Sequence, residues 1–318
     1  MRILFMGSGA FAAPTLRWLA GSNHDIAAVV TQPARGSGRG RRTVRTPAGA
    51  VGRDLGLEVI EIGDVNDPAF IERVEAMRVD VGLVVAFGQK LGPRFLDTAP
   101  GGYLNLHASL LPKLRGAAPI NWAIARGERQ TGCTVFRIVE RMDAGPVLTA
   151  RSTDIQPAET AGELHDRLAV SGLDAVKDAL AMMADDRRPS GTPQRDELAT
   201  KAPKLRKSDG AIDFRRDAED VVNHIHAMTP WPGATVRYES TTGRWENVAI
   251  VRARLVDHRP GPGAPPGTID DRLSVAARGG WIELIEIKPS SGRLMTWREY
   301  VNGRHVAAGD RFVAMPPA

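Results

Sequence analysis

The sequence has almost no cysteine and no long apolar run. Cys133 is the single cysteine in 318 residues, which excludes an intrachain disulfide and a metal site built from several cysteines. Apolar stretches such as Val81–Phe87 fall far short of the roughly 18 residues that a membrane-spanning helix needs. The apolar start Ile3–Met6 is shorter than the hydrophobic part of a secretory signal. We therefore expect a cytoplasmic protein that contains no membrane span.

The composition is typical of a soluble globular protein. Hydrophobic residues make up 42% of the chain and charged residues 25%, which excludes a disordered chain, a collagen and a coiled coil. A length of 318 residues suggests two domains.

Positive charge is concentrated in two short segments. Basic and acidic side chains balance in residues 1–186, with 21 of each, and in residues 208–318, with 14 of each, whereas residues 187–207 hold seven basic and two acidic side chains. The other basic segment has no acidic residue and contains Arg35, Arg39, Arg41, Arg42 and Arg45. Such focused charge favours a polyanionic partner, because a glycine-spaced arginine run that is mobile alone can become ordered on RNA phosphates. The alternative is a solvated loop.

Apolar runs alternate with amphipathic stretches in the first half of the chain. Stretches such as Ala10–Ala20 and Ala69–Met77 predict helices, and Thr160 with Glu163 indicates a capping box that opens a longer helix. The pattern predicts an α/β architecture, a Rossmann-like, mostly parallel sheet with helices on both faces, over residues 1–186. The predicted strands are Ile3–Phe5, Ile26–Val30, Val59–Ile60, Val81–Ala86, Tyr103–His107 and Thr134–Val139.

The sequence pattern changes after this domain. Residues 187–207 lack apolar periodicity and contain several prolines, which predicts a basic linker. Beyond it, a helical segment at Asp217–Met228 precedes short strand-like runs separated by glycine and proline. This pattern predicts a smaller C-terminal β-barrel domain, with an OB-like arrangement, at residues 208–318.

A glycine-containing turn follows the first predicted strand. Gly7, Gly9 and Ala12 imitate the dinucleotide-binding fingerprint G-x-G-x-x-A. The second predicted strand ends Val30-Thr31-Gln32-Pro33, without the acidic residue that would bind a ribose hydroxyl. We therefore favour a plain tight turn over a nicotinamide site.

The run LNLHASLLPKLRGAAP, residues 104–119, begins on a predicted strand. Asn105 and His107 are two residues apart, so their side chains project from one face near the carboxyl end of the strand, where α/β sheets bind ligands. Asp143 follows a later strand on a glycine-containing turn, from which a carboxylate could stabilise a protonated imidazole. Taken alone, the pair also fits a half-buried histidine beside a turn asparagine, and Asp143 fits a turn former.

At these residues the sequence resembles the 10-formyltetrahydrofolate-dependent formyltransferases. The run at residues 104–119 is the most specific part of the resemblance, and shorter motifs extend it over nearly the whole chain. Ser8-Gly9, Leu114 and Pro146 depart from the usual pattern but remove no catalytic group. The supporting motifs are Phe11-Ala12 after the first turn, the arginine loop after Thr31-Gln32-Pro33, Val85-Ala86-Phe87-Gly88, Met142-Asp143-Ala144-Gly145 and Pro230-Trp231-Pro232-Gly233-Ala234.

The resemblance implies formyl transfer from 10-formyltetrahydrofolate to the α-amino group of initiator methionyl-tRNA, without a metal. It implies Asn105, His107 and Asp143 as the catalytic residues. It also implies tRNA binding by the C-terminal domain, and we expect a monomer. The resemblance places the folate at Phe87, Gly88, Ser109, Leu110, Leu111 and Pro112, and the tRNA at Arg35, Arg39, Arg41, Arg42 and Arg45.

Three alternatives fit parts of the same pattern. A formyltransferase for another amine, such as a sugar nucleotide or glycinamide ribonucleotide, would share the catalytic residues without needing the arginine loop. A dinucleotide-binding oxidoreductase would use Gly7 and Gly9. In a non-catalytic RNA-binding protein, Asn105 and His107 would be incidental.

Overall fold

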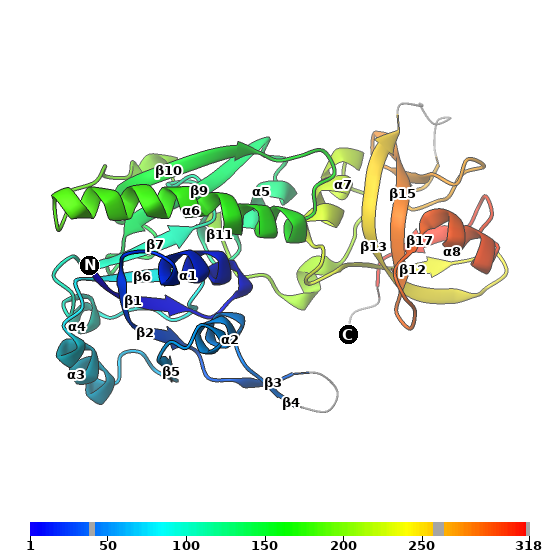
Figure 1. The fold of residues 1–318 in the computed structure, drawn as a ribbon. Helices are drawn as coiled ribbons and strands as arrows, with labels where there is room; N and C mark the ends of the chain where they lie inside the picture. Colours follow the sequence, from blue (N-terminus) through cyan, green and yellow to red (C-terminus); the bar gives the residue numbers. More distant parts are fainter. Residues whose placement is uncertain (38–41, 257–263, 316–318) are drawn as a thin grey trace. The chain divides into compact units, whose positions relative to one another are not determined.

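The computed structural model describes residues 1–37, 42–256 and 264–315, which form two compact units (Figure 1). The first unit consists of Met1–Gly116, Thr131–Thr153 and His165–Ala202. The second consists of Ala117–Gln130, Asp154–Leu164 and the described residues that follow Ala202. The predicted domains 1–186 and 208–318 remain a prediction about which parts of the chain fold alone.

The first unit is built on a seven-stranded sheet. Its central strand β1 is parallel to β2 and β6, while β5 extends the parallel part beyond β2 and β7 extends it beyond β6. β9 runs antiparallel to β7. The predicted mostly parallel sheet is thus confirmed. In spatial order the strands are β10 (Val147–Asp154), β9 (Gln130–Arg137), β7 (Tyr103–His107), β6 (Val81–Val85), β1 (Arg2–Gly7), β2 (Asp25–Thr31) and β5 (Val59–Glu61).

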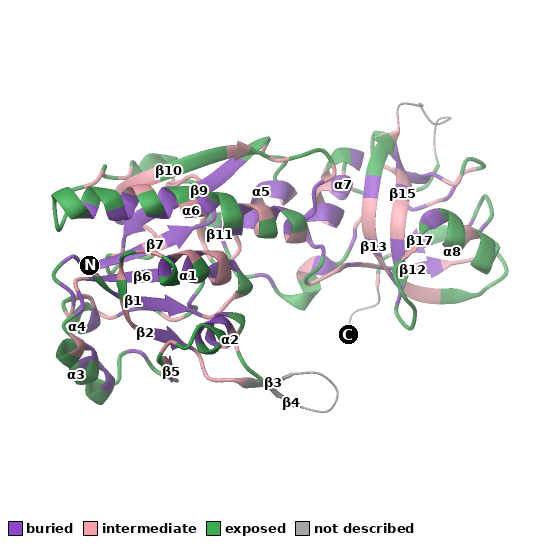
Figure 2. Ribbon diagram, viewed as in Figure 1, coloured by how far each residue is buried: buried purple, intermediate pink, exposed green. Residues whose placement is uncertain are grey.

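Helices cover both faces of this sheet, as predicted. On one face, α3 (Pro68–Met77) and α4 (Pro93–Leu96) bury Phe70 and Phe95 against strand residues that include Tyr103. On the other face lies α6 (Ala161–Asp185), where a Cβ on Gly172 would be 2.8 Å from Cys133 Sγ and 3.4 Å from Leu106. Figure 2 shows the central strands β1, β6 and β7 as almost wholly buried, whereas the edge strand β10 is largely exposed. The remaining helices of the unit are α1 (Ala13–Ala20) and α2 (Pro47–Asp54).

The predicted capping box at the start of α6 is confirmed. The Thr160 N–H donates to Glu163 Oε2 at 2.8 Å, and the Glu163 N–H donates to Thr160 Oγ1 at 3.3 Å. Both bonds satisfy backbone donors that the first helical turn leaves without partners.

The second unit contains an antiparallel, nearly closed sheet, which confirms the predicted barrel. β14 and β17 are the edge strands of the sheet. The segment just before β14 bridges the two edges, because Thr268 pairs with Arg311 of β17 and Ile269 pairs with Val275 of β14. In spatial order the strands are β14 (Val275–Ala277), β15 (Gly280–Pro289), β13 (Trp245–Val256), β12 (Ala234–Glu239) and β17 (Arg311–Val313), with β16 (Met295–Thr296) paired to β15. Its helices are α5 (Pro119–Ala125), α7 (Ala218–Ala227) and α8 (Trp297–Arg304).

A buried carboxylate joins two parts of the barrel. Asp310 is 1% exposed and accepts four hydrogen bonds, from the Tyr238 hydroxyl (2.5 Å), the Thr241 N–H (2.8 Å) and hydroxyl (3.2 Å), and the Ala307 N–H (2.9 Å). Burial alone would raise the pKa of this carboxyl group, but these hydrogen bonds outweigh it and lower the pKa. Asp310 therefore remains ionised inside the barrel wall.

Two short pairings were not predicted. Arg35–Ser37 (β3) and Arg42–Val44 (β4) form an antiparallel hairpin at the base of the arginine loop. Lys201–Ala202 (β11), in the predicted linker, pairs in parallel with Arg115–Gly116 (β8). Strands of two or three residues are too short to show a hydrophobic period, so the sequence pattern gives no sign of them.

In the part of the chain that the structure describes, no helix is both long enough and apolar enough to cross a membrane.

Candidate active site

The carboxyl end of β7 carries two of the predicted catalytic side chains. Asn105 and His107 share the face opposite Leu106, whose side chain is directed towards α6. His107 is buried and Asn105 is half-buried. Among the described residues the Asn105 amide has no hydrogen-bond partner, so it is free to donate to a ligand.

A backbone carbonyl orients the His107 ring. Nε2 lies 3.0 Å from Leu114 O, and because a carbonyl oxygen only accepts, Nε2 carries a proton. Leu114 has a φ of 61°, and its N–H donates to Thr200 Oγ1 at 2.8 Å. Nδ1 is therefore the nitrogen left for chemistry, and it lies 3.9 Å from Asp143 Oδ2.

Asp143 lies on the turn between β9 and β10 with a φ of 50°. Its Oδ2 accepts a hydrogen bond from the Gly116 N–H at 2.8 Å. A Cβ at Gly116 would lie 2.4 Å from Ala202 O, so the pairing of β8 with β11 requires glycine there. Within the described chain no donor contacts Oδ1, and the Asp143 side chain is 15% exposed. The structure thus brings His107 and Asp143 together, with Nδ1 and Oδ2 beyond direct hydrogen-bond distance.

The loop after β7, predicted to bind folate, is held in shape by one hydroxyl group. Thr134 Oγ1 donates to Ser109 O at 2.7 Å and accepts from the Leu111 N–H at 3.1 Å. The Ser109 hydroxyl is buried and donates to Lys113 O at 2.7 Å. Leu110, Leu111 and Pro112 are half-buried and so present an apolar surface.

The other predicted folate residues differ in what they offer a ligand. Phe87 is buried in the core, and its carbonyl accepts hydrogen bonds from Gln32 Nε2 (2.8 Å) and Ser8 Oγ (3.1 Å). Gly88 is exposed, with a φ of 82°. Phe87 therefore shapes the site from within the core, whereas the Gly88 backbone is accessible.

The first turn is not arranged for a dinucleotide. The Ser8 and Gly9 N–H groups both donate to Ala86 O, at 3.2 and 3.1 Å, so they are not available to a pyrophosphate. A Cβ at Gly7 would lie 2.8 Å from Ala12 Cβ, which explains the glycine by close packing. These contacts fit the tight turn that we favoured.

The predicted RNA-binding arginines are described only in part. Arg39 and Arg41 lie outside the described residues. Arg35 and Arg42 lie in β3 and β4, and Arg45 is exposed just after the hairpin. The part of the loop that holds Arg39 and Arg41 is therefore left as a prediction.

Sequence reasoning missed two residues of the predicted linker that contact the site. Thr200 accepts the Leu114 N–H, and the Gln194 amide donates to the carbonyl oxygens of Asp143 (2.9 Å) and Gly145 (2.7 Å). A proline-rich, basic segment carries no periodic signal that could have identified them.

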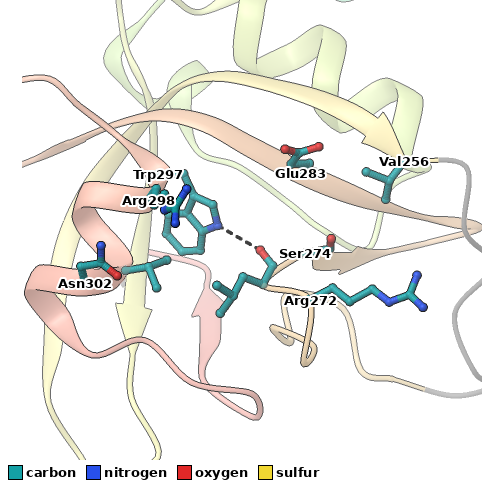
Figure 3. Close-up of a pocket in the computed structure, with 9 residues that line it drawn as sticks. Val256, Arg272, Ser274, Glu283, Trp297, Arg298 and Asn302 are labelled. Carbon is teal, nitrogen blue, oxygen red and sulfur yellow. Dashed lines mark hydrogen bonds between the residues drawn. The ribbon is translucent and has the colours of Figure 1, made fainter.

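The second unit contains a pocket of about 460 Å³ between α8 and the loop before β14 (Figure 3). Trp297 Nε1 donates to Leu273 O at 3.0 Å inside it. Arg272 and Arg298 are exposed on opposite sides of the pocket, and neither guanidinium group pairs with a carboxylate in the described parts of the chain. None of the predicted catalytic or folate residues lines this pocket.

Among residues 1–37, 42–256 and 264–315, no group of three histidine, cysteine or acidic side chains is arranged to hold a metal ion.

Solved structures share the fold of this chain. HypX from Aquifex aeolicus, in complex with tetrahydrofolic acid, matches 97% of this chain with a TM-score of 0.62 and 18% identity, and the chain spans 48% of HypX. The N-formyltransferase from Helicobacter canadensis, bound to folinic acid and dTDP-3-aminofucose, matches 90% of this chain and 98% of its own, with a TM-score of 0.64 and 14% identity. At such low identity these matches show the fold alone.

Sequence comparison is more specific. The formyl transferase family model matches residues 1–180, and the model of the formyl transferase C-terminal domain matches residues 204–305. The methionyl-tRNA formyltransferase of Methylococcus capsulatus is 40% identical over 98% of this chain and 99% of its own length. That of Heliobacterium modesticaldum is 38% identical over 98% of this chain and its whole length. The chain therefore belongs to the methionyl-tRNA formyltransferase family of formyl transferases.

Proposed function

We propose that this enzyme transfers the formyl group of 10-formyltetrahydrofolate to the α-amino group of methionine on initiator tRNA. One observation carries the proposal: relatives named for this reaction match the chain at 40% identity over nearly the full length of both. The folate bound to HypX and to the Helicobacter canadensis enzyme supports a folate-derived donor. The expected cytoplasmic location and monomeric state stay predictions.

The catalytic roles follow from the polar contacts of the site. As the amine attacks the formyl carbon, negative charge develops on the formyl oxygen. The Asn105 amide and a protonated Nδ1 of His107 donate hydrogen bonds to that oxygen, since Nε2 already donates to Leu114 O. Asp143 favours the charged imidazole and, through a water molecule, passes the proton that leaves the amine to N10 of the folate. The bond between N10 and the formyl carbon breaks as N10 takes up this proton, and tetrahydrofolate leaves.

The loop after β7 suits a flat, aromatic ring with polar edges. Leu110, Leu111 and Pro112 offer apolar surface, while Gly88 offers backbone groups. Thr134 fixes the loop shape, so little conformational entropy is lost when a ligand binds. In this proposal the residues hold the pterin and direct the formyl group to Asn105.

We propose RNA contacts on both units. In the first, the arginine run Arg35–Arg45 supplies phosphate contacts. In the second, Arg272 and Arg298 are exposed at the pocket, and no carboxylate of the described residues pairs with either guanidinium group, which suits phosphate contacts.

The arginine loop is tested by replacing Arg39, Arg41 and Arg42 with alanine and measuring tRNA affinity against salt. Each lost phosphate contact should flatten the plot of log affinity against log salt by about 0.7 to 0.9. Folate affinity should not change. The double variant Arg272→Ala/Arg298→Ala makes the same measurement for the second unit. Wild-type affinity and salt slope in either variant would remove that surface from the proposal.

The acceptor is tested by incubating the purified chain with 10-formyltetrahydrofolate and, separately, initiator methionyl-tRNA, a dTDP-amino sugar and glycinamide ribonucleotide. We expect formylation of the tRNA. For the two small amines we expect a kcat/KM at least about a hundredfold lower, because they lack the RNA that the enzyme contacts. Faster formylation of a small amine would overturn the tRNA proposal. Titration with NADH, which should not bind, separates the enzyme from a dinucleotide-binding oxidoreductase.

A further inference from the structure

The predicted linker is anchored at both ends to the first unit. Thr192 pairs with Val147, through N–H···O bonds of 2.7 and 2.8 Å, and Lys201–Ala202 pairs with Arg115–Gly116. Gln194 lies between these anchors. Its position is therefore set by backbone pairing on either side.

The Gln194 side chain uses its whole hydrogen-bonding capacity. Nε2 donates to Asp143 O at 2.9 Å and to Gly145 O at 2.7 Å. Oε1 accepts from Arg115 Nε at 3.1 Å and Nη2 at 2.7 Å. Two donors and two lone pairs are all that a primary amide has, so no other side chain of this length makes the same four bonds.

Other contacts also hold the turn that carries Asp143. Arg141 pairs with the Asp196 carboxylate, the Ala144 N–H donates to Arg141 O at 3.3 Å, and Gly145 lies close against Arg137 O. Asp143 has a φ of 50°, in the left-handed region that a residue with a side chain adopts only at a cost in free energy. Met142 is 64% exposed and adds no packing to the turn, and none of these contacts binds the carbonyl groups of Asp143 or Gly145. The bonds from Gln194 hold the carbonyl groups on both sides of Ala144.

The contacts of Gln194 also connect the Asp143 backbone carbonyl to the strand that binds the Asp143 carboxylate. Its oxygen is bound by Arg115, and the next residue, Gly116, donates its N–H to the Asp143 carboxylate. Asp196 forms an ion pair with Arg115 Nη1 at 3.0 Å, which keeps the guanidinium in place. The Asp143 backbone is thus linked to β8 through Gln194, and the Asp143 carboxylate is bound to β8 directly.

We propose that Gln194 is a positioning residue for Asp143, which sets the distance between the Asp143 carboxylate and His107 Nδ1. The inference rests on the proposed catalytic role of Asp143. Without Gln194 the turn samples other conformations, and the carboxylate faces the imidazole in only part of the molecules. Catalysis then falls through the position of Asp143.

The test compares Gln194→Glu with wild type. Glutamate has the same shape and still accepts from Arg115, but it places a carboxylate oxygen against two carbonyl oxygens. We expect kcat to fall by about 10- to 100-fold, with KM for tRNA and for 10-formyltetrahydrofolate within about threefold of wild type. Gln194→Met, which keeps length and adds no charge, should behave alike. Wild-type turnover in both variants would overturn the inference, and so would failure of both to fold.

A matched control is Asn66→Asp. Asn66 also bridges two backbone groups, because Nδ2 donates to Lys90 O at 3.0 Å and Oδ1 accepts from the Gly92 N–H at 2.6 Å. It contacts none of the residues around Asp143, so its kcat should stay near that of wild type. An equal loss of kcat in both variants would assign the effect of Gln194 to general weakening of the unit.

A double-mutant cycle distinguishes positioning from stability. In the Asp143→Asn background, Gln194→Glu should cost little further activity, because the group that it positions has already been lost. An additive loss would overturn the inference.

Amide hydrogen exchange at residues 141–145 needs no substrate. It should become at least about tenfold faster in Gln194→Glu than in Asn66→Asp. Unchanged exchange would overturn the inference even if the acceptor proved to be another amine, whereas absence of tRNA formylation by wild type would overturn the proposed function alone.

Discussion

Asp143 in the first unit and Asp310 in the second are both held by hydrogen bonds from distant segments, but they differ in what is left free. Asp310 is 1% exposed and accepts four hydrogen bonds. Asp143 has a 15% exposed side chain, accepts one hydrogen bond from Gly116 and stands 3.9 Å from a histidine nitrogen. A carboxylate whose capacity is filled by the protein stabilises the fold, whereas one with spare capacity beside an imidazole can take part in a reaction.

Replacing Asp143 by asparagine should give the largest effect. The amide keeps the shape and can still accept from Gly116, but it cannot favour a charged His107 or accept a proton. We expect turnover to fall by about a hundredfold or more, with the free energy of unfolding changed by less than about 0.5 kcal/mol. Single-turnover kinetics and urea unfolding measure the two quantities. His107→Ala and Asn105→Ala should each lose a similar factor, and near-normal turnover would remove the residue concerned from the mechanism.

The same substitution at Asp310 should have the opposite result. The donors around Asp310 bind two carboxylate oxygens, but an asparagine side chain has only one acceptor oxygen. The substitution therefore leaves buried N–H or O–H groups without a hydrogen bond. We expect the second unit to lose about 2–4 kcal/mol of stability. Turnover by the folded fraction, at saturating tRNA, should be unchanged. If Asp310→Asn lowered turnover without loss of stability, the contrast between the two carboxylates would be wrong.

Two tyrosines sharpen the comparison inside the barrel. Tyr238 donates to Asp310 at 2.5 Å, whereas the buried Tyr300 hydroxyl has no partner among the described residues. Tyr238→Phe should therefore cost about 1–2 kcal/mol, while Tyr300→Phe should be neutral or slightly stabilising. Equal losses in thermal unfolding would show that ring packing, and not the bond to Asp310, decides both values.

The smallest expected effect is the dependence of stability on pH that Glu163 causes. Burial alone would raise the pKa of Glu163, but hydrogen bonds from Arg252 and Thr160 outweigh it and lower the pKa to about 2 from 4.5. Because the folded pKa is the lower one, this carboxylate stabilises the second unit above about pH 4.5 and loses its effect as the pH falls towards 2. Glu163→Gln should thus be less stable than wild type at pH 7 and equal to it near pH 2. Urea unfolding at several pH values measures the difference, and a constant difference would contradict the assignment.

The parts of the fold that rest on local periodicity could be predicted. The parallel strands of the first sheet, the capping box of Thr160 and Glu163, and the shared face of Asn105 and His107 follow from spacing along one segment. The hairpin of β3 and β4, and the pairing of β8 with β11, could not be predicted, because so few residues show no period.

The linker shows the limit most clearly. Its prolines and basic residues predict a connection without structure, yet Thr200 holds Leu114 and Gln194 holds the turn of Asp143. These bonds join residues that are 86 and 51 positions apart. No local pattern encodes such a pairing, so sequence reasoning identified the proposed catalytic residues without the residues that support them.

The sequence by itself determined the elements and the chemistry that they carry: a strand that places an amide and an imidazole on one face, and a later turn with a carboxylate. The tertiary structure decided which nitrogen of His107 is free, because only the folded chain brings Leu114 O to Nε2. It also decided that Asp143 keeps spare acceptor capacity and that Asp310 does not. Strand periodicity depends on residues close together in the sequence. The hydrogen-bond partner of a polar atom depends on segments that are distant in the sequence and come into contact only in the folded chain.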